Sequence, residues 1–219
     1  MARSPSFGAL VVFAFSIGGY VPLSIGGWQH PSEMNLAAYG IWLIIAALLV
    51  YSSWKQGFAG LLLPFGFCVG NSWMLALGLW RGGYTFNLGQ AEAFALYGLV
   101  LTLSLWAAVG TKTGTWSPRI LYLGAISAEA ISYYPQWKQY LVSHERPTWW
   151  LLAGWCISMT GVLVNIVFVE GLPGKFMMTD ERYWHLHPKE KRLLPIFEES
   201  AFSIENLTLG SFTIFLMAR

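Results

Sequence analysis

Three carboxylates lie on the last apolar segment of this 219-residue chain, at Glu198, Glu199 and Glu205. An ionisable side chain at membrane depth costs free energy, and it therefore indicates a functional site. If the segment is helical, Glu198 and Glu205 share one face because they are seven residues apart, whereas Glu199 points about 100° away. An acidic face of this kind could supply a proton to a substrate. The alternative is a helix that lies on the membrane surface with its glutamates in water.

Two further carboxylates lie on apolar segments. Glu129 stands in the middle of the segment from Arg119 to Tyr140, and Glu92 stands at the start of another apolar run. Each has a structural alternative, since Glu129 could bond to a neighbouring helix and Glu92 could interact with a helix N-terminus through the dipole. The candidate proton donors are therefore Glu92, Glu129, Glu198, Glu199 and Glu205.

The composition is that of a membrane protein. The chain is 55% hydrophobic and 11% charged, with a mean hydropathy of +0.50, whereas soluble proteins are roughly 25% charged. We therefore expect an all-α integral membrane fold that contacts the lipid bilayer. Seven segments approach the roughly 20 residues that cross a bilayer core. They are 7–27, 36–54, 57–80, 91–110, 118–141, 148–170 and 194–217.

Charge and cysteine content exclude several other classes. A net charge of +2 is too small to indicate a nucleic-acid partner. Both cysteines, Cys68 and Cys156, lie on apolar segments, where a thiol behaves as a small hydrophobe, so we expect no disulfide, metal or other cofactor. Nine Lys and Arg residues fall on the side of the N-terminus and four on the other, which favours a cytoplasmic N-terminus. The expected location is the endoplasmic reticulum of a eukaryote or the plasma membrane of a bacterium.

An internal repeat is visible when the prolines are aligned. Pro22 and Trp42 are 20 residues apart, as are Pro135 and Trp155, at an offset of 113. The repeat predicts a single transmembrane domain made of two similar three-helix units plus a linking helix, with halves at about 1–110 and 118–219. Duplicated halves that face each other place matching groups in a shared central cavity.

Amides and aromatic rings on the apolar segments are the candidate substrate-binding groups. A buried amide more often bonds between helices than to a ligand, and most aromatic rings serve packing or the membrane interface. Rings that line a cavity can stabilise a cation. The candidates are Asn71, Trp73, Tyr133, Tyr134, Trp155, Asn165, Phe202 and Asn206.

The segment Leu194 to Phe202 resembles the Pro-x-Glu-Glu-x-x-Phe-Phe signature of the integral-membrane, carotenoid-type lycopene cyclases, with Phe197 as an inserted residue. The size and seven-helix layout also resemble small fungal membrane cyclases that make meroterpenoids, although their Trp-Glu pair is absent at Trp42 and Trp73. The resemblance implies cyclisation of a hydrophobic isoprenoid substrate, started by a neutral carboxylic acid in an apolar chamber. Asp180 is the only aspartate, so no Asp-rich Mg²⁺ motif is present and the expected chemistry is metal-free.

A second resemblance implies a different function. Two segments, Tyr20 to Leu23 and Tyr134 to Gln136, are similar to the Pro-Gln motifs of the PQ-loop and SWEET transporter families, which carry asparagines where Asn71 and Asn206 fall. The motif at Tyr20 to Leu23 lacks its Gln, and the charge distribution is opposite to that of these families. The favoured hypothesis is a terpenoid cyclase, and the alternatives are a small-solute transporter, with or without proton coupling, and a non-catalytic subunit of a membrane complex. A closed aromatic chamber with one acid favours catalysis, whereas an amide-lined cavity between the halves favours transport.

Overall fold

The computed structural model describes residues 7–56, 61–86, 89–107, 116–134, 137, 141, 148–170 and 193–218. These residues form helices and no strand, which confirms the all-α prediction. Residues 171–192 lie outside the described residues, as does Pro135, where the sequence predicts a kink equivalent to one at Pro22. The helical elements in chain order are α1 (Phe7–Gly18), α2 (Tyr20–Gln29), η1 (Pro31–Glu33), α3 (Leu36–Gln56), α4 (Leu62–Arg81), α5 (Gln90–Leu105), α6 (Trp116–Ser132), α8 (Trp149–Val164), η4 (Asn165–Val169) and α11 (Leu193–Ala218).

Five stretches of helix are long and apolar enough to cross a membrane, which confirms the prediction for these five segments. They are Phe7–Gln29, Leu36–Lys55, Leu62–Arg81, Trp149–Val169 and Ser200–Ala218. The described parts of the other two predicted segments are the 16-residue helix α5 and the 17-residue helix α6. Both are shorter than the roughly 20 residues that a bilayer core requires, so a crossing by α5 and α6 stays a prediction.

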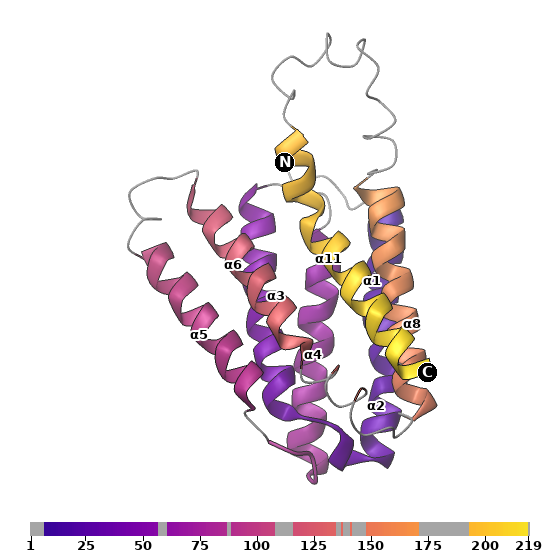
Figure 1. The fold of residues 1–219 in the computed structure, drawn as a ribbon. Helices are drawn as coiled ribbons and strands as arrows, with labels where there is room; N and C mark the ends of the chain where they lie inside the picture. Colours follow the sequence, from indigo (N-terminus) through magenta and orange to yellow (C-terminus); the bar gives the residue numbers. More distant parts are fainter. Residues whose placement is uncertain are drawn as a thin grey trace.

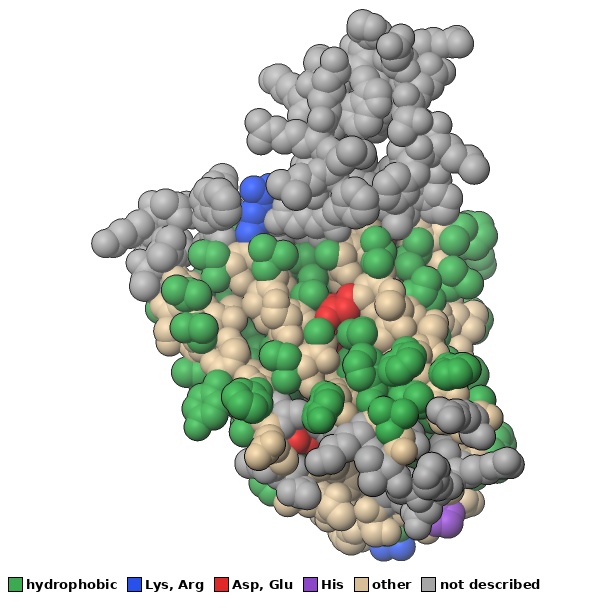
Figure 2. Space-filling view, viewed as in Figure 1, with side chains coloured by type: hydrophobic (Ala, Val, Ile, Leu, Met, Phe, Trp, Pro, Cys, Tyr) green, Lys and Arg blue, Asp and Glu red, His purple; other side chains and the backbone are tan. Residues whose placement is uncertain are grey.

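The outer surface of the bundle matches a lipid environment. Figure 2 shows hydrophobic side chains over the sides of the molecule, and Lys and Arg towards its two ends. Helix α5 alone exposes Phe94, Tyr97, Val100 and Leu101, each by 60% or more. Soluble monomers rarely expose apolar patches of this extent. The chain is therefore a membrane protein.

Basic and aromatic side chains meet at the helix ends. The Lys55 Nζ atom lies 4.8 Å from the ring centroid of Trp54 at the end of α3. The Arg81 guanidinium lies 5.2 Å from the ring centroid of Trp28, where α2 and α4 end together. Such pairs are typical of the interface between a bilayer and water, where the ring is half buried and the charge stays hydrated.

The first span is interrupted three residues before Pro22. Helix α1 ends at Gly18 and α2 begins at Tyr20, with Gly19 between them. A proline cannot donate a hydrogen bond to the carbonyl four residues earlier, here that of Gly18, and its ring clashes with that carbonyl. The sequence predicts a kink here for the same reason.

Six helical segments follow one another around a ring, with α1 and α2 counted as one segment. Helix α4 packs against both α1 and α3, α3 packs against α6, and α11 packs against both α6 and α8. The ring closes because α8 packs against α1 and α2. Helix α5 lies outside this ring on α6 and α3, at one edge of the bundle in Figure 1. The centre of the ring is therefore bordered by helices from both halves of the chain.

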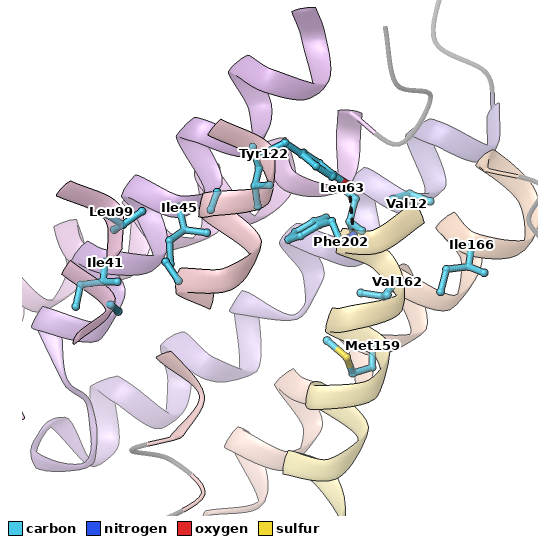
Figure 3. Close-up of a cluster of buried hydrophobic side chains, with 14 residues drawn as sticks. Val12, Ile41, Ile45, Leu63, Leu99, Tyr122, Met159, Val162, Ile166 and Phe202 are labelled. Carbon is cyan, nitrogen blue, oxygen red and sulfur yellow. Dashed lines mark hydrogen bonds between the residues drawn. The ribbon is translucent and has the colours of Figure 1, made fainter. Parts of the chain in front are cut away.

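Apolar packing joins these helices, and hydrogen bonds between helices add to it. Figure 3 shows Leu63 of α4, Tyr122 of α6 and Phe202 of α11 converging near one point. The backbone N–H of Phe202 donates to the Tyr122 hydroxyl oxygen at 3.3 Å. Where α2 meets α8, a Cβ atom on Gly19 would lie 2.8 Å from the carbonyl oxygen of Gly154. Small residues allow this close approach of two membrane helices.

Candidate functional site

A cavity lies at the centre of the ring and receives side chains from α2, α3, α4, α6, α8 and α11. Its empty volume is about 610 Å³ with the open surroundings included, and about 60 Å³ of this can hold the centres of water molecules. One water requires roughly 10–15 Å³ on that measure, so there is room for several waters or a small solute. The lining residues are Tyr20, Leu23, Tyr39, Trp42, Ile45, Ala46, Leu49, Phe67, Asn71, Glu129, Tyr133, Trp155, Ser158, Met159, Phe202 and Asn206.

Two tyrosine–asparagine pairs border the cavity. The Tyr20 hydroxyl donates to the Asn71 Oδ1 atom at 2.9 Å, and the Tyr133 hydroxyl donates to the Asn206 Oδ1 atom at 3.1 Å. All four side chains are buried. Each asparagine belongs to the helix that packs between two others, α4 for Asn71 and α11 for Asn206. The amides are thereby held at the cavity wall by a side chain from a neighbouring helix.

Aromatic rings form the adjoining wall. The ring centroids of Trp42 and Trp155 are 6.5 Å apart and their planes meet at 87°. The Tyr133 ring lies 6.4 Å from Trp42 and 5.6 Å from Trp155. The Trp42 indole N–H donates to the Ser132 hydroxyl at 2.6 Å, and that hydroxyl donates to the Glu129 carbonyl oxygen at 2.6 Å. These bonds attach the α3 side of the wall to helix α6.

The only carboxyl group among the described lining residues is that of Glu129, which is 8% exposed. It is hydrogen-bonded to the Asn206 side chain. The Asn206 amide nitrogen also donates to the Phe202 carbonyl oxygen at 3.1 Å. The Glu129 Oε2 atom has no hydrogen-bond partner among the described residues. One carboxyl oxygen of a lining residue is therefore buried without a hydrogen-bond partner among the described residues.

A second carboxyl group lies beside the first. Glu205 on α11 interacts electrostatically with Glu129 and hydrogen-bonds to the backbone of Ala130, the residue that follows Glu129 on α6. Within the part of the chain that the structure describes, its Oε2 atom also has no partner. Two acidic side chains that are 76 positions apart in the sequence thus meet where α6 and α11 pack together.

The other candidate acids do not border the cavity in the described part of the chain. Glu92 is 4% exposed on α5, with its carboxyl group near Gly89 just before that helix begins. Glu198 and Glu199 belong to the first turns of α11, and their side chains lie outside the described residues. The shared face of Glu198 and Glu205 therefore stays a prediction.

The candidate binding residues divide into two groups. Asn71, Tyr133, Trp155, Phe202 and Asn206 are among the residues that line the cavity. Trp73 and Tyr134 are more than half exposed on the outer surface, and the Trp73 indole N–H donates to the Ser24 hydroxyl at 2.8 Å. Neither is among the cavity residues.

Asn165 belongs to a separate polar cluster at the π-helical turn η4. Its Nδ2 atom donates to the Glu170 Oε1 atom at 2.7 Å and to the Ser203 hydroxyl at 3.0 Å. The Ser203 hydroxyl in turn donates to the same Glu170 oxygen at 2.6 Å. The three side chains are buried against one another, and none of them is among the cavity residues. The cluster ties the end of α8 to α11.

Tyr20, Tyr39, Trp42 and Ser158 line the cavity and were not among the candidates from the sequence. A signal for two of them was available, because Tyr20 and Trp42 precede Tyr133 and Trp155 by 113 residues. No comparable signal marks Tyr39 or Ser158, whose inward direction depends on how α3 and α8 are rotated about their axes.

Comparison of the chain with protein-family models, with curated proteins and with solved structures finds no match. The function is therefore argued from the residues of the cavity.

Proposed function

We propose that the chain is a membrane transporter for a small polar solute, which binds in the central cavity. The observation that carries this proposal is the presence of two tyrosine–asparagine pairs, Tyr20–Asn71 and Tyr133–Asn206, around one cavity. An amide-lined cavity between the halves is the feature that favours transport over catalysis. The similarity of the Pro-Gln motifs to those of the PQ-loop and SWEET families agrees with it.

The proposal includes a duplicated architecture with seven spans. One unit comprises α1 with α2, α3 and α4, the other comprises α6, α8 and α11, and α5 links them. In each unit the third helix packs between the first two. Tyr20 and Tyr133 are 113 positions apart, as are Trp42 and Trp155, while Asn71 and Asn206 are 135 apart. The proposed orientation has a cytoplasmic N-terminus.

Alternating access would be a movement of one unit against the other. In transporters built from repeats, the binding site lies near the bilayer midplane at the interface of the repeats, and rocking of the units exposes it to each side in turn. The interfaces between the proposed units are α3 with α6, and α1 and α2 with α8. The cavity lies between these two interfaces, so that a rocking movement would open it on one side and close it on the other.

Uptake by liposomes that contain the purified chain tests the proposal. We expect time-dependent, saturable uptake of at least one member of a panel of radiolabelled small polar solutes. Asn71→Ala and Asn206→Ala should each reduce uptake about fivefold, because one hydrogen bond to the solute contributes about 1 kcal/mol.

Two exposed residues near the asparagines provide matched controls. Ser72 and Thr208 lie on the same helices, and their hydroxyls donate to carbonyls of their own helix at 2.9 Å and 2.8 Å. Ser72→Ala and Thr208→Ala should leave uptake within twofold of the unchanged chain. Uptake that is equal in all four variants would contradict a binding role for the two asparagines.

A proton-initiated terpenoid cyclase is the second candidate. The observation that favours it is Glu129, a buried carboxyl group that lines an aromatic cavity and has one oxygen without a partner among the described residues. The rings of Trp42, Trp155 and Tyr133 could stabilise a carbocation. Asn71 and Asn206 weigh against this reading, because polar atoms in a cyclase chamber can trap the carbocation. The test is product formation from isoprenoid substrates by membranes that contain Glu129→Gln, Glu198→Gln, Glu199→Gln or Glu205→Gln, and full activity in all four would end the cyclase hypothesis.

A further inference from the structure

We infer that the solute of the central cavity is a small organic cation, an amine or a quaternary ammonium compound. The cation would be held by the Glu129 carboxylate and by the rings of Trp42, Trp155 and Tyr133. This inference rests on the proposed function, because it names the chemical class that the same cavity would accept.

The charge of the cavity favours a cation. Glu129 contributes a carboxyl group, Glu205 adds a second one beside it, and none of the described lining residues is Lys, Arg or His. Lys55 and Arg81 are at the outer ends of α3 and α4. A buried ionised carboxylate is costly unless a positive charge pairs with it. A cationic ligand would compensate the carboxylate where no described basic side chain does.

The unpartnered oxygen of Glu129 also favours a cation. Glu129 is more than nine-tenths buried, and its Oε2 atom lacks a partner among the described residues, although its carboxyl group is hydrogen-bonded to the Asn206 side chain. An ionised carboxylate accepts hydrogen bonds and donates none. It therefore binds a ligand that brings positive charge or N–H donors more strongly than it binds a neutral solute.

The aromatic wall offers ring faces that a cation can contact. A cation gains energy within about 6 Å of an aromatic ring centroid, and most with tryptophan. Trp42, Trp155 and Tyr133 lie within 6.5 Å of one another, and the two indole planes are almost perpendicular. Rings at such angles form a corner, in which one ammonium group can contact more than one ring.

The volume of the cavity fits a small ligand. The space of about 60 Å³ for water centres corresponds to about four to six waters at roughly 10–15 Å³ each. A trimethylammonium group with a short tail is of this order. Choline is therefore a suitable probe, and its uncharged isostere, 3,3-dimethylbutan-1-ol, has the same shape without the charge.

Binding of these two probes to the full chain in nanodiscs, measured by calorimetry, tests the inference. We expect choline to bind at least tenfold more tightly than the isostere. Glu129→Gln should weaken choline binding at least tenfold and change isostere binding by less than twofold. Glu129→Asp, which keeps the acid, should retain more choline affinity than Glu129→Gln, and Trp155→Phe should lose several-fold.

Glu170→Gln is the matched control, because Glu170 is a buried glutamate that is absent from the cavity lining. It should leave choline affinity unchanged. Size-exclusion elution and melting temperature of each variant separate lost binding from lost folding. The inference is wrong if choline does not bind, if the isostere binds equally well, or if folded Glu129→Gln binds choline as the unchanged chain does.

Uptake into liposomes separates this inference from the proposed function. Choline binding without uptake would support the cation site and contradict transport. Uptake of neutral solutes with no preference for choline over its isostere would support transport and overturn the inference.

Discussion

The two tyrosine–asparagine pairs are alike in geometry but differ in the residues next to them. Four positions before Tyr133 stands Glu129, whereas four positions before Tyr20 stands Ser16. Immediately before Asn206 stands Glu205, whereas Gly70 precedes Asn71. At these two positions the Tyr20–Asn71 pair has the hydroxyl group of Ser16 and the hydrogen atom of Gly70. The Tyr133–Asn206 pair has two carboxyl groups there.

Packing explains why the first pair has no room for acids. The Ser16 side chain is fully buried, and its hydroxyl donates to the Val12 carbonyl oxygen of its own helix at 2.8 Å. A Cβ atom on Gly70 would overlap the Tyr20 ring, which lies directly against the α4 backbone. The hydrogen-bonded framework therefore occurs twice around the cavity, whereas the acidic groups occur once. A bound solute would therefore meet one neutral side and one acidic side.

The largest expected effect comes from placing an acid at the first pair. Ser16→Glu would add a long side chain and a charge at a site with no exposed surface. Overpacking and an unpaired buried charge together should cost about 3 kcal/mol or more. We expect little monodisperse protein in size-exclusion chromatography, whereas Glu129→Ser should yield folded protein. A Ser16→Glu variant with an unchanged melting temperature would show that the first pair can accommodate an acid.

A smaller effect is expected from one added methyl group. Gly70→Ala should displace the Tyr20 ring and weaken its bond to Asn71, at a cost of about 1–3 kcal/mol. Glu205→Ala, at the matching position, removes a partly buried side chain without adding volume and should cost less. Thermal unfolding in one detergent compares the two variants directly. An equal or larger loss for Glu205→Ala would contradict the packing explanation.

The smallest effect is expected from removing the tyrosine hydroxyls. Tyr20→Phe and Tyr133→Phe each delete one hydrogen bond, and each should lower the unfolding free energy by about 1 kcal/mol. Their effects on solute binding should differ, because Tyr133→Phe also releases Asn206, which holds the Glu129 carboxyl group. Choline affinity should fall more in Tyr133→Phe than in Tyr20→Phe. The opposite order would show that the acidic side does not control binding.

Local features of the chain were predictable from its residues. Apolar runs of bilayer length predicted the membrane class and the five spans, because hydropathy and length act within a single segment. The break at Gly19 was predictable as well, since Pro22 cannot complete the hydrogen bond to Gly18. The offset of 113 between Tyr20 and Tyr133 could be counted in the sequence, although it says nothing of which asparagine each hydroxyl meets.

Only the tertiary structure decided which polar groups meet. Glu129 contacts Asn206 and Glu205, which follow it by more than 70 residues, whereas Asn165 turns away to Glu170 and Ser203. A helix that is apolar on all sides carries no periodic pattern that marks its inward face. Its rotation follows from packing, as where the Phe202 backbone meets Tyr122. The sequence therefore determined that this protein is helical and lies in a membrane, and the packing of its helices decided which acids and amides share a cavity.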